Sequence, residues 1–180
     1  MSFIRRIDFG SAQGVLREVY ERIAGARGGV AEVMQVQSSN PSALSAHFEL
    51  YKALLFGRSE LDRRTREMIG VVVSAANACA YCVAHHREPL RRYGVDETLL
   101  DTLCEGEIPH ELVAYPIECL LHYVRALTVQ PAASRDAIDA LREAGWSDSA
   151  IVDATLTAGY FNFVNRIALG LGVALEPSFD

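Results

Sequence analysis

The chain has 180 residues, a length that suits one domain with a substantial hydrophobic core. Half of its residues are hydrophobic and 22% are charged, a composition that excludes a disordered chain. The net charge is −6 and no basic stripe is interleaved with aromatic residues, which argues against a nucleic-acid partner because phosphate binding depends on clustered cations.

Apolar residues recur at helical spacing along almost the whole chain, and no alternation typical of a β-strand is found. The expected helices begin at Ser, Asn or Asp caps. In chain order these caps are Ser11, Asn40, Ser59, Asn77, Asp96, Ser134 and Ser147. The expected helices end at glycines, which are Gly25, Gly57, Gly94, Gly106, Gly145 and Gly172. After the helix expected to end at Gly94, helices are predicted at about 96–105, 110–129, 134–144 and 147–170.

We therefore expect an all-α fold of about seven or eight helices in a single domain that covers residues 1–180. It divides into N-terminal helices (1–58), a helix pair that carries a CxxC motif (59–94) and C-terminal helices (95–180). No linker-like stretch separates these parts, and the only glycine cluster lies at 25–29.

The amino terminus and the longest apolar run give no sign of export or membrane insertion. The first residues, MSFIRRIDFG, lack the apolar core of a signal peptide. The longest apolar run, Met68 to Ala80, is interrupted by Ser74 and Asn77 and is too short to span a bilayer. We expect a cytoplasmic protein with no membrane partner. In that compartment a CxxC pair serves catalysis or metal binding more often than a disulfide framework.

The segment CAYCVAHH, residues 79–86, carries the most specific chemistry in the chain. If Asn77 caps its helix, Cys79 lies in the first turn and Cys82 follows one turn later on the same face. Unpaired N–H groups and the positive end of the helix dipole favour a thiolate at this position. The spacing also lets the two sulfurs form a disulfide, so that a cysteine oxidised to sulfenic acid can be resolved within the same helix.

Three side chains are candidates for moving protons to and from these thiols. His85 and His86 follow Cys82 by three and four residues, and a neutral imidazole on that side of the helix can accept the thiol proton. Glu67 lies on the preceding helix, and its carboxylate in an apolar stretch suits a general base. Taken alone, a residue such as Glu67 is more often a solvated helix residue, and only the nearby thiols and histidines make it a candidate.

Two cysteines at this spacing are also half of a zinc site. His85 and His86 are adjacent and point about 100° apart on a helix, so one ion could hardly bind both together with both thiols. We therefore expect no bound metal.

Several other polar or reactive residues are assigned no chemistry. Cys104 and Cys119 are expected to pack as small hydrophobic residues. No cysteine or acidic motif surrounds the remaining histidines, His47, His110 and His122. In the otherwise apolar last helix, polar groups need partners if they are buried, and a structural or interface role is favoured over substrate contact for Asn162, Asn165 and Arg166.

The spacing of the candidate residues resembles the signature of a known family. Glu67, then eleven residues, then Cys79-x-x-Cys82-x-x-x-His86 looks like the motif of AhpD-like alkylhydroperoxidases, within the carboxymuconolactone decarboxylase superfamily. The stretch FGRSELDRRTREMIGVVVSAANACAYCVAHH and the closing FNFVNRIALGLGV look like the peroxidase-related branch. The resemblance covers most of the chain.

The resemblance implies an all-α bundle that assembles into homo-oligomers, commonly trimers or hexamers. It implies that Cys82 attacks the peroxide, that Cys79 resolves the sulfenic acid, and that Glu67 and His86 relay protons. It further implies that no metal, haem or flavin is needed, because sulfur carries both electrons. A dithiol must then reduce the disulfide, and a lipoyl group or a thioredoxin-like protein would serve.

Tyr81 departs from the pattern of the best-known members, which have a histidine immediately before the second cysteine. A phenol is a much weaker base than imidazole at neutral pH. Tyr81 is therefore expected either to donate a hydrogen bond in catalysis or to pack beside the site. Pro89, inside the same helix, predicts a kink there.

The sequence thus predicts a thiol peroxidase that reduces organic or hydrogen peroxides through Cys79 and Cys82. A general dithiol oxidoreductase shares all of these residues. Decarboxylation of a muconolactone-type lactone is another alternative, although those members do not depend on a CxxC. The last alternative is a non-enzymatic zinc-binding or redox-sensing module.

Overall fold

The fold is seen in a computed structural model, which describes residues 2–25, 29–132 and 134–176. Of the glycine cluster at 25–29, residues 26–28 lie outside the described residues. The described part is all helical, which confirms the predicted class, and it contains no strand. Its nine α-helices are α1 (Gly14–Ala24), α2 (Glu32–Gln35), α3 (Pro41–Phe56), α4 (Arg63–Ala76), α5 (Ala80–Arg92), α6 (Glu97–Cys104), α7 (Tyr115–Val129), α8 (Arg135–Glu143) and α9 (Asp148–Gly170).

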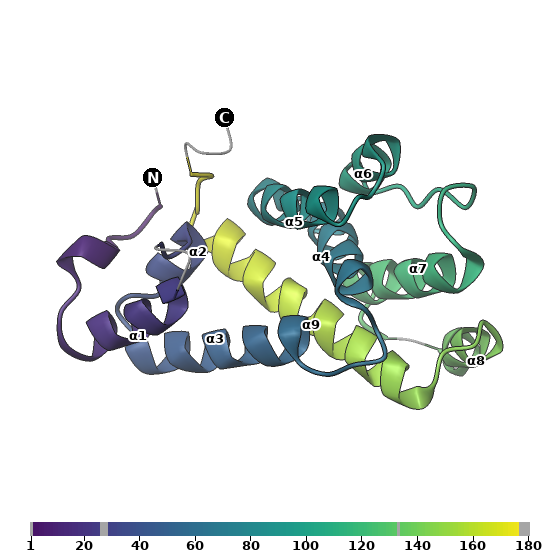
Figure 1. Ribbon diagram of the computed structural model, residues 1–180, viewed down its shortest axis with the longest axis horizontal. Helices are drawn as coiled ribbons and strands as arrows, with labels where there is room; N and C mark the ends of the chain where they lie inside the picture. The colour runs from purple at the N-terminus through teal and green to yellow at the C-terminus, as the bar shows by residue number, and fades with distance from the viewer. Residues whose placement is uncertain (1, 26–28, 133, 177–180) are drawn as a thin grey trace.

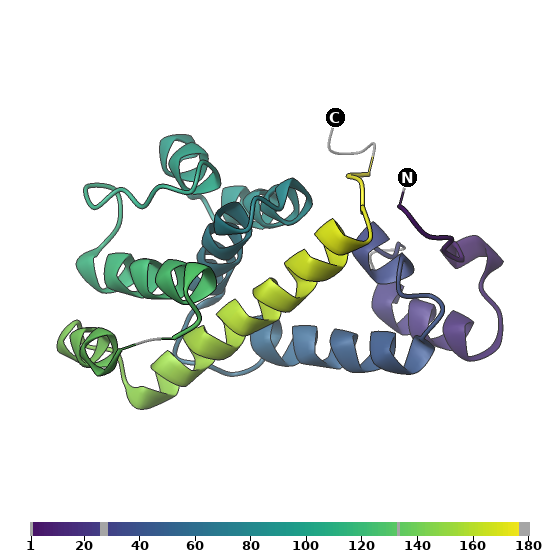
Figure 2. The same ribbon diagram turned by 180° about the vertical axis from the view of Figure 1, so that it is seen from behind.

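Helix α4 is the centre of the packing. It contacts α3, α5, α6, α7 and α9, and every one of its residues from 65 to 74 is buried. Helix α9 runs diagonally across the molecule, between the group formed by α1, α2 and α3 and the group formed by α4 to α8 (Figures 1 and 2). None of the described helices combines the length and the apolar character needed to cross a membrane.

Several of the predicted helix starts are confirmed. Asn40 accepts a hydrogen bond from the backbone N–H of Ala43 at 3.1 Å, with Pro41 as the first helical residue. This arrangement satisfies one of the four N–H groups that lack a partner at a helix start. Side-chain caps also stand where the sequence predicted them at Asp96, Ser134 and Ser147.

The predicted starts at Ser59 and Ser11 are wrong, at Ser59 because a competing contact takes its side chain. Ser59 Oγ hydrogen bonds to Asp153 of α9 at 2.5 Å, and Asp62 caps α4 by accepting from the N–H of Thr65 at 2.7 Å. Ser11 closes a separate 3₁₀ turn, Phe9–Ser11, and α1 begins only at Gly14.

Two further features differ from the prediction, and the end of α5 before Gly94 agrees with it. The helix expected at 110–129 begins at Tyr115, with a proline in its first turn. The four-residue helix α2 was not predicted, because so short a segment carries no periodicity. The segment that contains Pro89 remains helical to Arg92.

Helices α4 and α9 approach closely at Gly70. A Cβ atom at Gly70 would lie 2.5 Å from Cζ of Phe161, whose side chain is fully buried. The Phe161 ring meets His86 of α5 edge to face, with the ring centroids 4.6 Å apart. The missing side chain at Gly70 therefore leaves room for a ring that packs against both α4 and the helix of the CxxC motif.

Replacing Gly70 with Ala should lower the free energy of unfolding by about 1–3 kcal/mol, because the added methyl overpacks the core against Phe161. Urea denaturation would measure the change. The matched control is Gly159→Ala, an exposed position of α9 with open space around its Cβ. This control should stabilise the protein by about 0.5–1 kcal/mol through helix propensity alone. Equal stabilisation by both substitutions would contradict the close approach.

Candidate active site

The two cysteines lie where the chain turns from α4 into α5. The sequence placed Asn77 as the cap of the second helix, and this was wrong: Asn77 is the last, C-capping residue of α4. Its amide donates to Asn162 Oδ1 at 3.0 Å and to Asn165 Oδ1 at 2.9 Å, which ties the end of α4 to α9. Ala78 then adopts a left-handed backbone conformation with φ of 54°, and Cys79 becomes the cap of α5.

The predicted position of the CxxC motif at a helix N-terminus is therefore confirmed, although the helix begins two residues later than expected. Cys79 is the N-cap residue and Cys82 lies three residues on, but the Cys79 side chain makes no capping hydrogen bond. The backbone N–H of Cys82 still helps to lower the pKa of Cys79. The two thiols also hydrogen bond to each other. Both cysteines are free and buried, with 1% and 2% of their surface exposed.

The contact between the sulfurs makes them inequivalent. The hydrogen bond from the Cys82 thiol lowers the pKa of Cys79 to about 7, although burial opposes the change, and the Cys82 N–H and the charge of His86 add to it. The same hydrogen bond, with burial, raises the pKa of Cys82 well above its ordinary value. The pair therefore loses one proton near neutral pH, and the charge then rests mainly on Cys79 while Cys82 keeps the shared proton.

Glu67 and His86 form a buried pair that joins α4 to α5. Glu67 Oε2 lies 2.5 Å from His86 Nδ1, and Arg63 Nε donates to the other carboxylate oxygen at 2.8 Å. Burial alone would raise the pKa of the fully buried Glu67, but the charges and hydrogen bonds of His86 and Arg63 outweigh it and lower the pKa. Glu67 is thus a carboxylate that orients the imidazole through Nδ1 and leaves Nε2 for proton transfer.

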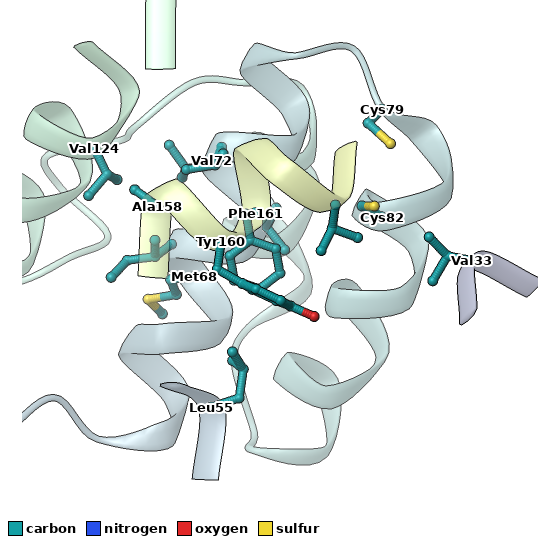
Figure 3. Close-up of a cluster of buried hydrophobic side chains, with 14 of the residues drawn as sticks. Val33, Leu55, Met68, Val72, Cys79, Cys82, Val124, Ala158, Tyr160 and Phe161 are labelled. Atoms are coloured by element: carbon teal, nitrogen blue, oxygen red, sulfur yellow. The ribbon is translucent and has the colours of Figure 1, made fainter. Parts of the chain in front are cut away.

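A cavity of about 300 Å³ opens beside Cys82, and we call it the site cavity. Its polar lining includes Cys82, Glu67, His86, Tyr81 and Arg63, so the structure brings the predicted site residues other than Cys79 to one space. The remaining wall is largely apolar and aromatic and includes Val33, Met34, Phe48, Tyr51, Tyr160 and Val164. Figure 3 shows several of these side chains around the two cysteines.

Cys79 borders a different space. A second hollow of about 370 Å³, the Cys79 hollow, is lined by small side chains together with Cys79, Arg87 and Cys104. Cys104 is partly buried against the core, as predicted, and burial raises the pKa of its thiol. Arg87 is held by Glu97 at 2.9 Å and by Asp101 at 2.6 Å. The two cysteines of the CxxC motif therefore border two separate recesses.

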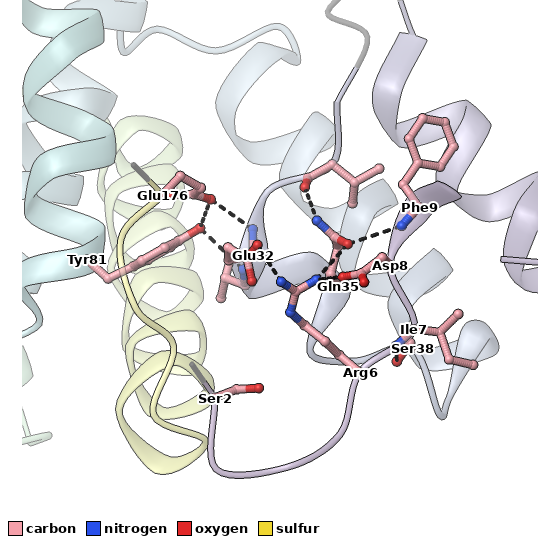
Figure 4. Close-up of polar contacts among 12 residues, drawn as sticks. Ser2, Arg6, Ile7, Asp8, Phe9, Glu32, Gln35, Ser38, Tyr81 and Glu176 are labelled. Carbon is pink, nitrogen blue, oxygen red and sulfur yellow. Dashed lines mark hydrogen bonds and ion pairs between the residues drawn. The ribbon is translucent and has the colours of Figure 1, made fainter. Parts of the chain in front are cut away.

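Tyr81 takes part in a network that the sequence did not reveal (Figure 4). Its hydroxyl donates to Glu176 Oε1 at 2.9 Å and accepts from the backbone N–H of Val33 at 3.2 Å. The second carboxylate oxygen of Glu176 lies 2.8 Å from His85 Nε2. Burial raises the pKa of Tyr81, so the phenol stays protonated and acts as a hydrogen-bond donor.

Glu176 is the functional residue that sequence reasoning missed. It lies beyond the end of α9, in a segment without a motif, and only the fold brings it to α5. Burial would raise its pKa, but the hydrogen bonds from His85 and from the N–H of Glu32 lower it to about 2. The two histidines are thus bound to different carboxylates, His85 to Glu176 and His86 to Glu67, in line with their predicted divergence on the helix.

Of the remaining polar residues, Asn165 contacts Cys82 and two histidines lie on the surface. Asn165 was assigned a structural role, and its amide donates to Ser74 Oγ at 3.0 Å, but it also hydrogen bonds to the Cys82 sulfur. His110 and His122 are exposed. Within the described ranges, no group of three or more His, Cys, Asp or Glu side chains is arranged to hold a metal ion.

The fold and the site together define a class, that of all-α proteins with a thiol pair at a helix N-terminus beside a buried Glu–His pair. Residues 41–109 match the Carboxymuconolactone decarboxylase family, and this segment contains Glu67, both cysteines and His86. This match and the likeness to solved AhpD-like, peroxidase-related structures support membership of the superfamily of AhpD-like and carboxymuconolactone decarboxylase proteins.

Individual relatives agree with this membership. The uncharacterized protein YdfG of Bacillus subtilis is 28% identical over 120 residues, which is 64% of this chain and 78% of that protein. An AhpD-core, peroxidase-related protein from Ralstonia eutropha has a similar structure, with a TM-score of 0.86 and 24% identity over 99% of this chain and 94% of that one. The debrominase Bmp8 shares the fold, with a TM-score of 0.81 and 17% identity over 98% of this chain and 94% of that one.

Replacing Cys82 with Ala should raise the pKa of Cys79, because the substitution removes the thiol hydrogen bond that contributes most to lowering it. The rate at which iodoacetamide alkylates Cys79, followed by mass spectrometry of the cysteine peptide, should rise with a midpoint near pH 7 in the unmodified protein and at higher pH in the variant. Cys104→Ala is the control and should keep the original midpoint. The same midpoint in all three proteins would show that the sulfurs do not share a proton.

Proposed function

We propose that the protein is a thiol peroxidase that reduces organic or hydrogen peroxides through a Cys79–Cys82 dithiol–disulfide couple. One observation carries the proposal. Cys82 lines the site cavity together with the Glu67–His86 pair, whereas Cys79 does not line it. Cys79 lies one helical turn away, in hydrogen-bond contact with the Cys82 thiol. This is the arrangement that an attacking thiol and a resolving thiol require.

The chemistry balances with the groups that the site holds. His86 accepts one proton from the cysteine pair, and the shared proton moves from Cys82 to Cys79. The Cys82 thiolate attacks the terminal peroxide oxygen, forming an S–O bond, and the O–O bond breaks with its electron pair on the departing oxygen. His86 returns its proton to that oxygen, which leaves as an alcohol or as water. Cys79 then displaces hydroxide from the sulfenic acid, and its own proton completes the second water.

The same site makes the alternatives distinguishable. A general dithiol oxidoreductase would use a protein disulfide in place of a peroxide, and the enclosed site cavity favours a small substrate instead. A lactone decarboxylase has no need of a thiol pair. Consumption of hydroperoxide that depends on both thiols therefore separates the peroxidase from both of these activities.

Cys82→Ser should abolish oxidation of the protein by hydroperoxide, because the attacking sulfur is missing. Cys79→Ser should react once, form a stable sulfenic acid at Cys82 and stop, because no thiol resolves it. Single-turnover mixing with a sulfenic-acid-specific probe and mass spectrometry would show both results. Equal behaviour of the two variants would contradict the assigned roles, and a Cys79→Ser variant that continues to turn over would contradict the disulfide step.

The reductant is a dithiol, and we propose that its thiolate attacks Cys79 from the Cys79 hollow. Thiol–disulfide exchange requires the attacking sulfur to approach in line with the disulfide, on the side away from the leaving sulfur. The Cys79 hollow provides a recess on the Cys79 side, while Cys82 faces the site cavity. Peroxide and reductant would then reach the disulfide from different recesses.

Ala84→Leu should slow reduction of the disulfide and leave the peroxide step largely intact, because Ala84 lines the Cys79 hollow and is absent from the lining of the site cavity. Protein oxidised with diamide would be mixed with dithiothreitol and the return of thiols followed. The matched control is Ala140→Leu, on the exposed face of α8. If Ala84→Leu is reduced as fast as this control, the reductant does not enter through that hollow.

A further inference from the structure

A second buried hydrogen-bonded chain, separate from the Glu67–His86 pair, reaches the site cavity, and the peroxide chemistry derived so far does not use it. It consists of Gln37, His47 of α3 and Tyr160 of α9. His47 Nε2 lies 3.0 Å from the Tyr160 hydroxyl, and His47 Nδ1 lies within 3.1 Å of both amide atoms of Gln37. His47 and Tyr160 are only 3% and 5% exposed, and Gln37 is half-buried, so two of the three polar groups are kept inside an otherwise apolar region.

The two rings of this hydrogen-bonded network, those of His47 and Tyr160, have defined protonation states near pH 7. Burial lowers the pKa of His47 to about 4, so its imidazole is neutral near pH 7. Burial also raises the pKa of Tyr160 well above its ordinary value, so the phenol keeps its proton. A neutral imidazole and a protonated phenol serve as hydrogen-bond partners, and neither changes its protonation state near pH 7.

The contacts between Gln37 and His47 allow two directions of hydrogen bonding, and the proposal uses the one in which the Gln37 amide donates to His47. The Gln37 amide nitrogen donates one hydrogen to the carbonyl oxygen of Val33 at 2.8 Å and can give its second hydrogen to His47 Nδ1 at 3.0 Å. The proton of His47 then resides on Nε2 and is donated to the Tyr160 oxygen. In this arrangement the phenol hydrogen of Tyr160 is available to a group in the site cavity.

Tyr160 is placed to use that hydrogen. It lines the site cavity together with Cys82, and Cys82 lies close enough to act on its ionisation. Figure 3 shows its ring beside Phe161 with the hydroxyl at the outer end, turned away from the packed side chains at Val72 and Val124. The ring of Tyr51 lies 6.1 Å away, which fixes the Tyr160 ring from the side of α3.

We propose that Tyr160 is a further catalytic residue, whose hydroxyl donates a hydrogen bond to the peroxide oxygen that departs when Cys82 attacks. His47 and Gln37 are positioning residues that aim this hydroxyl. The inference rests on the proposed peroxidase function. Negative charge develops on the departing oxygen as the O–O bond breaks, and a donor already aimed at it stabilises the transition state more than the ground state. Tyr160 keeps its own proton, and the proton that neutralises the departing oxygen still comes from His86.

The test uses two peroxides whose departing groups differ in basicity. tert-Butyl hydroperoxide releases an alkoxide, a strong base that needs a hydrogen bond, and peracetic acid releases a carboxylate, which needs little help. Tyr160→Phe should slow oxidation of Cys82 by the hydroperoxide by about 100-fold, the order seen when one oxyanion donor is removed. Oxidation by the peracid should change far less. Both rates would be measured by stopped-flow under single-turnover conditions.

Two further variants separate catalysis from structure. Tyr123→Phe is the matched control, because it also removes a buried tyrosine hydroxyl, one that bonds to Thr155 Oγ1 at 2.8 Å and is absent from the lining of the site cavity. It should leave both rates unchanged. His47→Gln should give the same selective loss as Tyr160→Phe but a smaller one, since a more flexible amide replaces the ring that aims the phenol. Melting temperatures would confirm that each variant is folded.

The outcomes distinguish the two proposals. A wild-type protein that reacts with neither peroxide would overturn the proposed function and this inference with it. A reactive wild type whose Tyr160→Phe variant loses the same factor with both peroxides, or loses nothing, would overturn the role of Tyr160 alone. That role is also overturned if Tyr160→Phe does not fold and His47→Gln shows no selectivity between the two peroxides.

Discussion

The buried hydrogen-bonded pair of Glu67 and His86 is the interaction on which the rest of the site depends. A fully buried carboxylate is costly unless it is paired and hydrogen bonded, and here both of its oxygens are occupied, by His86 and by Arg63. The pair joins the central helix α4 to α5 and so sets the rotation of α5 that brings Cys82 to the site cavity. The Phe161 ring, which Gly70 accommodates, packs against His86 and completes this joint.

The second constraint is the cap of α5. Cys79 occupies the capping position, and the Cys82 thiol and backbone N–H both lower its pKa, so the two cysteines differ in pKa although they are one turn apart. The same geometry makes Cys79 and Cys82 border separate recesses. In the reaction that we propose, this separation keeps the peroxide and the reductant apart.

The sequence predicted local features well and long-range ones poorly. The all-α class, the cap at Asn40 and the CxxC at a helix start all follow from residues within a few positions of each other. The caps at Ser59 and Asn77 were wrong because partners on α9, more than 80 positions away, take those side chains. Glu176 could not be found for the same reason, since nothing near it in the chain indicates that it bonds to α5.

The replacement of the expected relay histidine by Tyr81 is explained by the same electrostatics. A buried phenol cannot accept the proton of Cys82, and its hydroxyl is committed to Glu176 and to the backbone of Val33. The base that the histidine would supply is already present in the thiol pair. With its pKa lowered to about 7, Cys79 is substantially ionised near neutral pH, and it is in direct hydrogen-bond contact with the Cys82 thiol. In the proposed reaction Tyr81 is therefore not needed as an acid or a base. Its hydrogen bonds instead connect α5 to the start of α2 and to the segment after α9.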